Sequence, residues 1–561
     1  MRKIRPRSTS TRPRSRATAS NASLLSRLCG VEVEYAFRYA PQTPRNLQSL
    51  YRAIIRHTLR RVPAVLATDN PNKCFLANGG CISLEANSQS LTDLSGFIET
   101  ATPQCRSPRE VVAYLAAFDT LIEEALASAA AEGEPLPMAA IRNSCDAFGH
   151  RYGQQENYEI TIADGGWLVL WRALLCLFFP LLVLHRAAVR CVLLLTLGLG
   201  GRGADVEDEA DDEAGGASSI SPTRLRMATT ALQTCHAPLE FCFSVMCRLC
   251  VMRDHRVALQ SFLASRVALD GAGHVDRNGR FWISSRGRQI NAFLGLAGSG
   301  CRYPMIDLSH WFRNVCLDNS WSFAALRKLF RRRQRVQICC GDTSTNQWVR
   351  WLQLGTTMLV LDAAEAGRLK DCPRFAEPHK LLRRFSGDTQ LSCEAADVQG
   401  RRWSAIGLQG YFISQIRRYM ASHKRVPNEA WEILNRWQMM VSRLAMRNAD
   451  RSEADALLGL SDWYTKQVLL RRMPANASEA ARKKIDIRYH EVGQQGYYYR
   501  ICRQRELLPL IDRQTLSRAA RTPPADTPAT RRGYLIREFS GSGQTLQIDW
   551  DQTRVIPARR G

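Results

Sequence analysis

Alternating apolar and polar residues predict three short β-strands in the N-terminal part of the chain, at Val31–Phe37, Cys81–Glu85 and Phe97–Ala101. Apolar residues at helical spacing predict an amphipathic helix at Pro44–Arg61. A second helix is expected to follow the third strand, running from a Ser-Pro-Arg-Glu capping box to about Glu132. The pattern therefore predicts a sheet with helices packed on it.

These strands carry acidic side chains. Glu32 and Glu34 share one face of the first strand, because strand side chains alternate with a period of two. Glu85 and Glu99 stand in the other two strands beside apolar neighbours. A carboxylate in such a strand is costly unless a cation, a metal or a hydrogen-bond donor meets it. The four side chains are either the outward face of a one-sided sheet or a site for a divalent metal or acid–base chemistry.

A strongly apolar segment, Trp167–Gly200, interrupts this pattern. Arg172 and a few other polar residues divide it, and neither of its uncharged runs reaches the roughly 20 residues of a simple transmembrane helix. We expect an interfacial or re-entrant helix pair that contacts a membrane, a buried helical hairpin, or an oligomer contact. An acidic linker at 205–213 follows.

The chain has 561 residues, enough for a large core, and a formal net charge of +25 from 77 Lys and Arg against 52 Asp and Glu. This charge favours acidic partners. No basic patch is interleaved with aromatic residues, so nucleic acid is not an expected partner. The 18 cysteines, with no cleavable signal peptide, favour reduced thiols and a cytoplasmic location, with the inner face of the membrane as a further candidate.

Two segments are conspicuously basic. Residues 1–27 contain no acidic residue, which predicts a disordered tail. Trp321–Arg335 is expected to form a helix that carries six Lys and Arg side chains between Arg327 and Arg335. Its basic face is either solvated or docks an acidic tail or phosphate groups.

Several segments resemble, in order along the chain, the motifs of one protein family. They are GVEVEY at Gly30–Tyr35, NGGCISLE followed by IETATPQC between Asn78 and Cys105, NSCDAFGHRYGQQENY at Asn143–Tyr158, GDTSTNQWVRWLQLGTTMLVLD at Gly341–Asp362, and QIDW at Gln547–Trp550. The chain resembles the family of the Pup ligase (proteasome accessory factor A) and the Pup deamidase/depupylase. That family belongs to the glutamine-synthetase-like carboxylate–amine ligases.

The resemblance implies an α+β fold, in which a glutamine-synthetase-like antiparallel sheet forms a cradle with helices packed behind it. A small C-terminal domain and the hydrophobic helical insert complete the expected architecture. We expect the basic tail at 1–27, the first part of the catalytic domain at 28–164, the insert with its acidic linker at 165–256, the second part of the catalytic domain at 257–475 and the C-terminal domain at 476–561.

The resemblance also implies an activity that depends on ATP and Mg²⁺. Ligases of this class activate a carboxylate as an acyl phosphate and pass it to an amine. In this family the acid is the C-terminal glutamate of Pup, and the amine belongs to a substrate lysine. The implied partners are a small acidic Pup-like modifier and lysine-bearing proteins, with the proteasome system as a further candidate.

The motifs carry roles onto individual residues of this chain. Matched by position, these are Glu85 as the catalytic carboxylate, Glu32, Glu34 and Glu99 as metal ligands, Thr102 and Trp550 as nucleotide contacts, and Gln155, Glu156 and Asp342 as residues lining the site.

The chain departs from the family pattern at this same site. Glu85 stands where the family has an aspartate, Cys81 and Ser83 replace an arginine and a tyrosine, and Gln155 replaces a histidine. Three alternatives follow: a deamidase or depupylase of the same family, a relative of the glutamate–cysteine ligases acting on a small molecule, and a catalytically degenerate, membrane-associated adaptor. ATP turnover that depends on Glu85 separates the enzymes from the adaptor.

Overall fold

The computed structural model describes residues 23–43, 45–68, 70–86, 96–146, 149–150, 152–198, 222–296, 303–316, 323–550 and 552–556. The expected acidic linker at 205–213 lies outside the described residues. The last residues of the expected disordered tail are in fact packed: Leu24 is buried, and Arg27 forms ion pairs of 2.6 Å with Asp362 and 2.9 Å with Glu365.

A ten-stranded sheet organises the molecule, with strand order β10-β11-β12-β7-β1-β5-β4-β3-β2 and β6 paired to β1. Its neighbouring strands are antiparallel except for the parallel pair β10–β11. The strands are β1 Cys29–Arg38, β2 Ala64–Leu66, β3 Lys73–Leu76, β4 Cys81–Ala86, β5 Gly96–Ala101, β6 Ala139–Ile141, β7 Gln154–Thr161, β10 Ala292–Gly295, β11 Pro304–Asp307 and β12 Arg333–Ile338.

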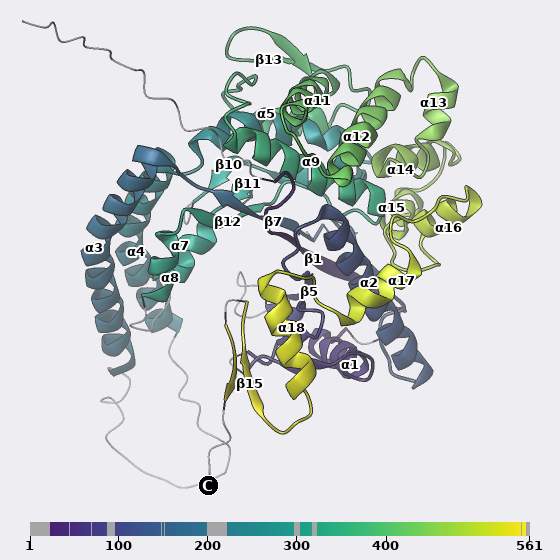
Figure 1. Ribbon diagram of the computed structural model, residues 1–561. Coiled ribbons are helices and arrows are strands. Elements are labelled where there is room, and N and C mark those ends of the chain that lie inside the picture. Colours follow the sequence, from purple (N-terminus) through teal and green to yellow (C-terminus); the bar gives the residue numbers. More distant parts are fainter. Residues whose placement is uncertain are drawn as a thin grey trace, which may run out of the picture.

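Long helices cover one face of this sheet (Figure 1). They are α1 Leu47–Leu59, α2 Pro108–Ala131, α5 Arg253–Asp270 and α9 Gln347–Glu365, and α11 Ala405–Ala421 and α12 Asn428–Met446 pack in turn on α5 and α9. The predicted capping box of α2 is present, with the Ser107 hydroxyl accepting from backbone amides and the Glu110 side chain reaching back. Both helices predicted from the N-terminal pattern are therefore confirmed, within a few residues of the expected bounds.

Shorter elements connect and flank these layers. They are α6 Ser285–Gln289, α7 Ser309–Cys316, α8 Ala324–Leu329, α10 Pro378–Ser386, α13 Arg451–Ala456, α14 Asp462–Arg471, α15 Glu479–Arg488, α16 Tyr497–Gln504, α17 Arg513–Arg521, and the two-stranded pairs β8 His274–Val275 with β9 Phe281–Trp282, and β13 Glu394–Ala396 with β14 Arg402–Ser404.

The helix-covered face of β7 carries a buried charge. Glu156 is fully buried and forms an ion pair of 2.6 Å with Arg266 of α5, while Tyr158 donates its hydroxyl to the same carboxylate at 2.6 Å. Asp342 is also buried, and its carboxylate accepts from the backbone amides of Ala272 and Arg286. Both residues were expected to line the site. Instead, Glu156 lies on the opposite face of the sheet, and Asp342 joins the loop at Ala272 to the start of α6.

The apolar insert forms an antiparallel helical hairpin at one side of the molecule, α3 Gly165–Gly198 with α4 Pro222–Cys250 (Figure 1). By length and composition, Gly165–Val192 is apolar enough to cross a membrane. One side of α3 is packed: Trp171 is buried and donates its indole N–H to the carbonyl of Leu329 at 2.8 Å. The hairpin is thus attached to α8 along part of its length.

The C-terminal segment packs on the other, open face of the sheet. Helix α18 (Pro528–Phe539) and the hairpin of β15 (Thr545–Ile548) and β16 (Thr553–Ile556) share a small hydrophobic cluster with Phe75 and Cys81. The residues that precede α18 contribute instead to the main core, for example through Ile511 and through Ala519 of α17. The division near residue 476 stays a prediction.

Replacing Glu156 by Ala should lower the free energy of unfolding by roughly 3 kcal/mol, because buried Arg266 would keep only Asp270 as an ion-pair partner and the Tyr158 hydroxyl would lose its acceptor. Glu159→Ala is the matched control: its side chain is on the same strand, on the open face, and its ion pair with Arg333 is partly exposed. Urea denaturation of both variants measures the difference. Equal losses would contradict the assignment of Glu156 to the packing of the core.

Candidate active site

The open face of the sheet gathers carboxylates from three neighbouring strands. In the register of β1 and β5, Glu34 lies directly opposite Glu99, and Glu99 in turn lies opposite Ser83 of β4. Glu32 lies two residues before Glu34 and Glu85 two residues after Ser83, so both share this face. We call Glu32, Glu34, Glu85 and Glu99 the acidic face. The structure brings together the carboxylates that the sequence placed in separate strands.

Burial and the repulsion between neighbouring carboxylates disfavour the ionised forms of these glutamates. Glu34 is only 8 % exposed, and burial raises its pKa, against a hydrogen bond of 2.6 Å that its carboxylate accepts from the amide of Gly153. Burial, and then the carboxylates of Glu32, Glu34 and Glu85, raise the pKa of Glu99 well above the ordinary value. Among the described residues, no cationic side chain forms an ion pair with Glu34 or Glu99. This part of the acidic face is short of positive charge.

Within the described part of the chain, ion pairs form only at the two ends of the acidic face. The positive charges of Arg286 and Lys73 also act on Glu34 and Glu99, respectively, and partly offset the rise in their pKa values. Lys73 of β3 lies 3.6 Å from a carboxylate oxygen of Glu85. At the other end, Glu32 forms an ion pair of 2.9 Å with Arg335 and accepts a hydrogen bond of 3.0 Å from Gln337. Gln155 lies directly across from Glu32 and contacts the same Gln337. Gln155 therefore does line this face, whereas Glu156, the next residue, points to the other side.

A cavity of about 890 Å³ opens at the Glu32 end of the acidic face. It is lined by Glu32, Thr102 and Trp550 together with a set of basic residues, namely Arg313, Lys328, Arg331, Arg333 and Arg335. The expected helix over Trp321–Arg335 is wrong in its second half, because α8 ends at Leu329 and Arg333 begins β12. The alternation of that strand points Arg333 and Arg335 to the open face.

The aromatic wall of this cavity is held by one buried arginine. The guanidinium of Arg532 lies 4.7 Å from the centre of the Trp550 ring and donates to the Trp550 carbonyl at 3.1 Å. The same side chain donates to the carbonyl of Gly79 at 2.6 Å and to Gln104 at 2.7 Å. Gly79 has φ +82°, and an added Cβ would collide with Ala529. Arg532 thereby ties the C-terminal segment to the turn between β3 and β4.

Thr102 lines the same cavity as Trp550 but is almost entirely buried. Its hydroxyl accepts a hydrogen bond of 2.9 Å from the amide of Val31. The side chain therefore fixes β1 against the end of β5. A role in contacting nucleotide stays a prediction for Thr102 and Trp550, as do the catalytic role of Glu85 and the metal-binding roles of Glu32, Glu34 and Glu99.

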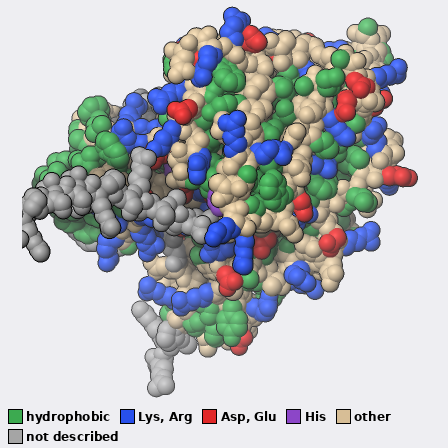
Figure 2. All heavy atoms as spheres, turned by 45° about the horizontal axis from the view of Figure 1, so that its top comes forward, with side chains coloured by type: hydrophobic (Ala, Val, Ile, Leu, Met, Phe, Trp, Pro, Cys, Tyr) green, Lys and Arg blue, Asp and Glu red, His purple; other side chains and the backbone are tan. Residues whose placement is uncertain are grey.

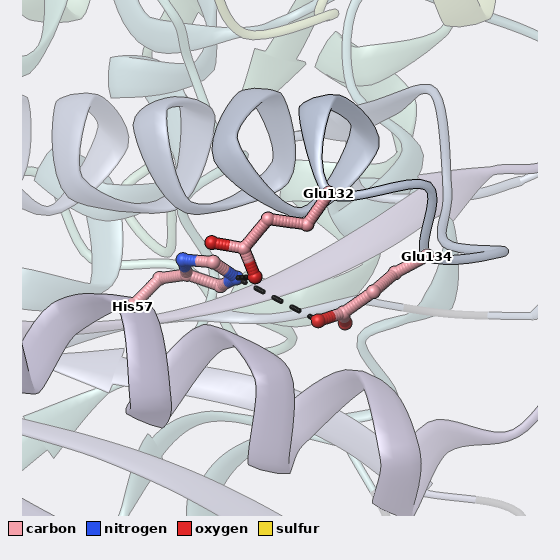
Figure 3. A group of neighbouring side chains, drawn as sticks. All are labelled: His57, Glu132 and Glu134. Atoms are coloured by element: carbon pink, nitrogen blue, oxygen red, sulfur yellow. Dashed lines mark ion pairs between the residues drawn. The ribbon is translucent and has the colours of Figure 1, made fainter.

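A second group of ligand-type side chains lies away from this face, where α1 and α2 end (Figure 3). The Nε2 atom of buried His57 points toward Glu132 and Glu134, at 3.7 and 3.9 Å. Both carboxylates already form ion pairs, Glu134 with Arg56 and Glu132 with Arg60. The two carboxylates are thus neutralised by arginines of α1 and of the residue after it, and we assign the cluster to the packing of α1 on α2.

Some residues of the site carried no signal in the sequence motifs. Lys73 is identified only by its register opposite Ser83, which places its side chain on the open face. Arg532 lies in an ordinary-looking amphipathic helix, and its contacts join segments more than 400 residues apart in sequence. The alternating run of β12 was the one available signal for Arg333 and Arg335.

Fold and site together define a class of protein. It is an α+β protein in which an antiparallel sheet carries clustered carboxylates beside a basic cavity, a combination suited to a divalent cation and a phosphate-bearing ligand.

The family model described as Pup-ligase protein matches residues 27–554, and the chain belongs to this family. A Pup–protein ligase of Acidimicrobium ferrooxidans is 23% identical over 541 residues, which cover 94% of this chain and 92% of the relative. A Pup–protein ligase of Bifidobacterium dentium is 28% identical over 316 residues, covering 53% of this chain and 60% of the relative.

Two solved structures share the fold. The complex of the prokaryotic ubiquitin-like protein Pup with its ligase PafA matches with a TM-score of 0.64 and 17% identity, covering 96% of this chain and 88% of the other. PafA in complex with ADP matches with a TM-score of 0.56 and 16% identity, covering 93% and 91%. The predicted family and the α+β fold with its sheet cradle are confirmed.

Glu99→Gln should remove a pH dependence of stability. The raised pKa means that the folded state binds the Glu99 proton more tightly than the unfolded chain does, so this group's contribution falls as pH rises from about 4.3 toward the folded-state pKa. In metal-free buffer, wild type should therefore lose stability relative to Glu99→Gln between pH 5 and pH 8, by about 1.4 kcal/mol for each unit of pKa shift. Urea denaturation at several pH values measures this, and a pH-independent difference would contradict it.

Proposed function

We propose that this protein is an ATP- and Mg²⁺-dependent ligase that joins the C-terminal glutamate of a Pup-like modifier to lysines of other proteins. The observation that carries the proposal is the acidic face, which is short of positive charge and adjoins the basic cavity. Membership of the Pup-ligase family supports the same activity, since the relatives are Pup–protein ligases.

The acidic face fits Mg²⁺, because carboxylate oxygens are its preferred ligands and the crowded anions need a cation. Glu34 and Glu99 would hold it with Glu32, whose carboxylate would exchange part of its contact with Arg335. When bound, the metal supplies positive charge against the triphosphate. The amide of Gly153 keeps the Glu34 carboxylate oriented toward the face, since its hydrogen bond fixes one oxygen.

The basic cavity would receive the nucleotide. Lys328, Arg331, Arg333 and Arg335 offer charge-assisted hydrogen bonds to phosphate oxygens. Trp550 offers an aromatic surface for the adenine ring, held in place by Arg532. The ADP complex of the homologous PafA supports a nucleotide site in this fold.

Glu85 would act as the general base that takes the proton from the attacking lysine amine. Its partial burial suits this role, and it lies at the end of the acidic face away from the basic cavity, with Glu34 and Glu99 between the two. Lys73, 3.6 Å away, keeps a positive charge beside this carboxylate. Cys81 stands where the family has an arginine, and its side chain packs against the C-terminal segment. Lys73 therefore supplies the positive charge at this end of the acidic face.

The expected partners are a small acidic modifier and lysine-bearing proteins, which match the net charge of +25. The PafA–Pup complex supports the modifier as partner of this fold. We place the protein in the cytoplasm, with the insert at 165–256 as an addition to the catalytic domain at 28–164 and 257–475, and the C-terminal domain from 476 closing the nucleotide end.

The test is a reaction of the full chain with ATP, Mg²⁺, a lysine-bearing protein and a Glu-ending Pup-like peptide, followed by ADP release and peptide mass. Wild type should form the conjugate, and Glu85→Gln should slow it by about 10²–10⁴-fold, the usual contribution of a general base. Glu394→Gln, an exposed glutamate paired with Arg402 on β14, is the control that should leave the rate unchanged.

Three other outcomes would overturn the proposal. Loss of ammonia from a Gln-ending peptide, or cleavage of a conjugate without ligation, would make the protein a deamidase or depupylase. ATP turnover stimulated by a free amino acid would indicate a small-molecule ligase. Nucleotide binding without turnover in wild type and Glu85→Gln alike would make it an adaptor.

Trp550→Ala should raise the KM for ATP about tenfold through loss of adenine stacking, with a smaller effect on kcat. Trp431→Ala, which removes a partly exposed tryptophan of α12, is the matched control and should leave KM unchanged. Initial rates over a range of ATP concentrations give both constants. An unchanged KM in Trp550→Ala would place the adenine elsewhere in the cavity.

A further inference from the structure

One side of the α3 helix presents a continuous apolar stripe to the outside. Its exposed members are Leu170, Leu177, Leu181, Leu184, Cys191 and Leu194, which recur at intervals of three, four and seven residues. Leu177, Leu184 and Leu194 are 69%, 67% and 70% exposed. Soluble proteins rarely leave so many neighbouring large apolar side chains in water. Figure 2 shows hydrophobic side chains gathered on this side of the molecule.

The charged side chains of α3 lie away from the stripe. Arg172, Arg186 and Arg190 are spaced by 14 and 4 residues, which brings all three to one side of the helix. Arg186 donates to the carbonyl of Val315 and Arg172 to that of Phe330, both on the body of the protein. The helix contains no Asp or Glu. The outer stripe is therefore free of charge along its length.

The opposite side of α3 is packed against the rest of the protein. This packing favours a helix that lies on a membrane over one that crosses it. Trp171, Leu175, Phe178 and Leu182 are at most 2% exposed, at the spacing of one helical face. The Trp171 ring packs against Trp311 of α7 and Phe243 of α4. A helix attached in this way over more than three turns cannot enter the bilayer along its whole circumference.

Basic and aromatic side chains lie at the start of this hairpin. Trp167 is 43% exposed, and the Arg253 guanidinium lies 3.9 Å from the centre of its ring. Arg248, at the end of α4, is exposed as well. Trp and Arg side chains of this kind favour the headgroup region of a bilayer, and arginine favours anionic lipid.

We propose that the outer stripe of α3 docks on the surface of an anionic lipid bilayer, with the helix lying in the interface and not spanning it. The stripe supplies apolar area at the depth of the acyl chains, and Arg248 and Arg253 contact headgroup phosphates. The inference is independent of the proposed ligase activity, because the acidic face and the outer stripe share no residue.

Co-sedimentation of the full chain with vesicles tests the docking. Wild type should bind vesicles of phosphatidylcholine that contain one third phosphatidylglycerol. Its affinity for vesicles of phosphatidylcholine alone should be at least tenfold lower. The double variant Leu177→Asp, Leu184→Asp should lose binding at least tenfold. The control double variant Val398→Asp, Leu508→Asp changes side chains of similar exposure outside the hairpin and should bind as wild type does. Wild type that stays in solution with both vesicles would overturn the proposal.

The exposed cysteine of the stripe, Cys191, provides a second readout that does not depend on a variant. Anionic vesicles should protect Cys191 from a membrane-impermeant maleimide, while Cys393 and Cys502 label equally with and without vesicles. If raising the protein concentration without vesicles gave the same protection from the maleimide, the stripe would be a self-association surface and the proposal would be overturned. Resistance of bound protein to extraction at alkaline pH would overturn the interfacial placement in favour of a spanning helix.

A ligation assay in vesicle-free solution keeps the two hypotheses apart. The Leu177→Asp, Leu184→Asp variant should conjugate the peptide at the wild-type rate, since its changes lie on exposed positions outside the cavity. Failure of membrane docking thus leaves the ligase proposal intact, and an inactive enzyme that binds vesicles leaves the docking proposal intact.

Discussion

The arrangement of the molecule depends on one electrostatic constraint, the crowding of carboxylates on the open face of β1, β5 and β4. Glu34 and Glu99 stand opposite each other in the sheet register, partly withdrawn from water. Like charges at this separation oppose folding unless a cation is near. The sheet that carries them must therefore be stabilised from elsewhere, and the face itself has a built-in affinity for positive charge.

That stabilisation comes from the opposite face, where the charges are paired. Arg266 neutralises Glu156 beneath β7, and Asp119 of α2 accepts from Tyr35 and pairs with Arg142. A buried glutamate therefore has an ion-pair partner on the covered face, whereas Glu34 and Glu99 on the open face have none among the described residues. Paired charge on the covered face holds the helices in place. On the open face, Glu34 and Glu99 are retained at a cost in stability, which is typical of functional sites.

Local patterns in the sequence predicted the parts of the fold that depend on local physics. The alternation around Glu32, Glu85 and Glu99 gave the strands, and the capping box gave the start of α2. The pattern did not separate the two faces of β7, because Glu156 follows Gln155 directly and a single residue changes the face. The role of Arg532 could not be predicted for another reason. Its partners lie far from it in sequence, and only the complete fold brings them together.

Helices α7 and α8 form a wall shared by two sites. His310 and Lys328 of these helices line the basic cavity, and the backbone of Leu329 receives the Trp171 indole of the apolar hairpin. A ligand that displaces α8 would move the carbonyl to which the Trp171 indole donates. As proposed, nucleotide and lipid would bind on the two sides of this wall. Because binding free energies are reciprocal, a nucleotide that strengthened lipid attachment would be bound more tightly at the bilayer by the same factor. The supply of nucleotide and the location of the protein would then be two variables of one equilibrium.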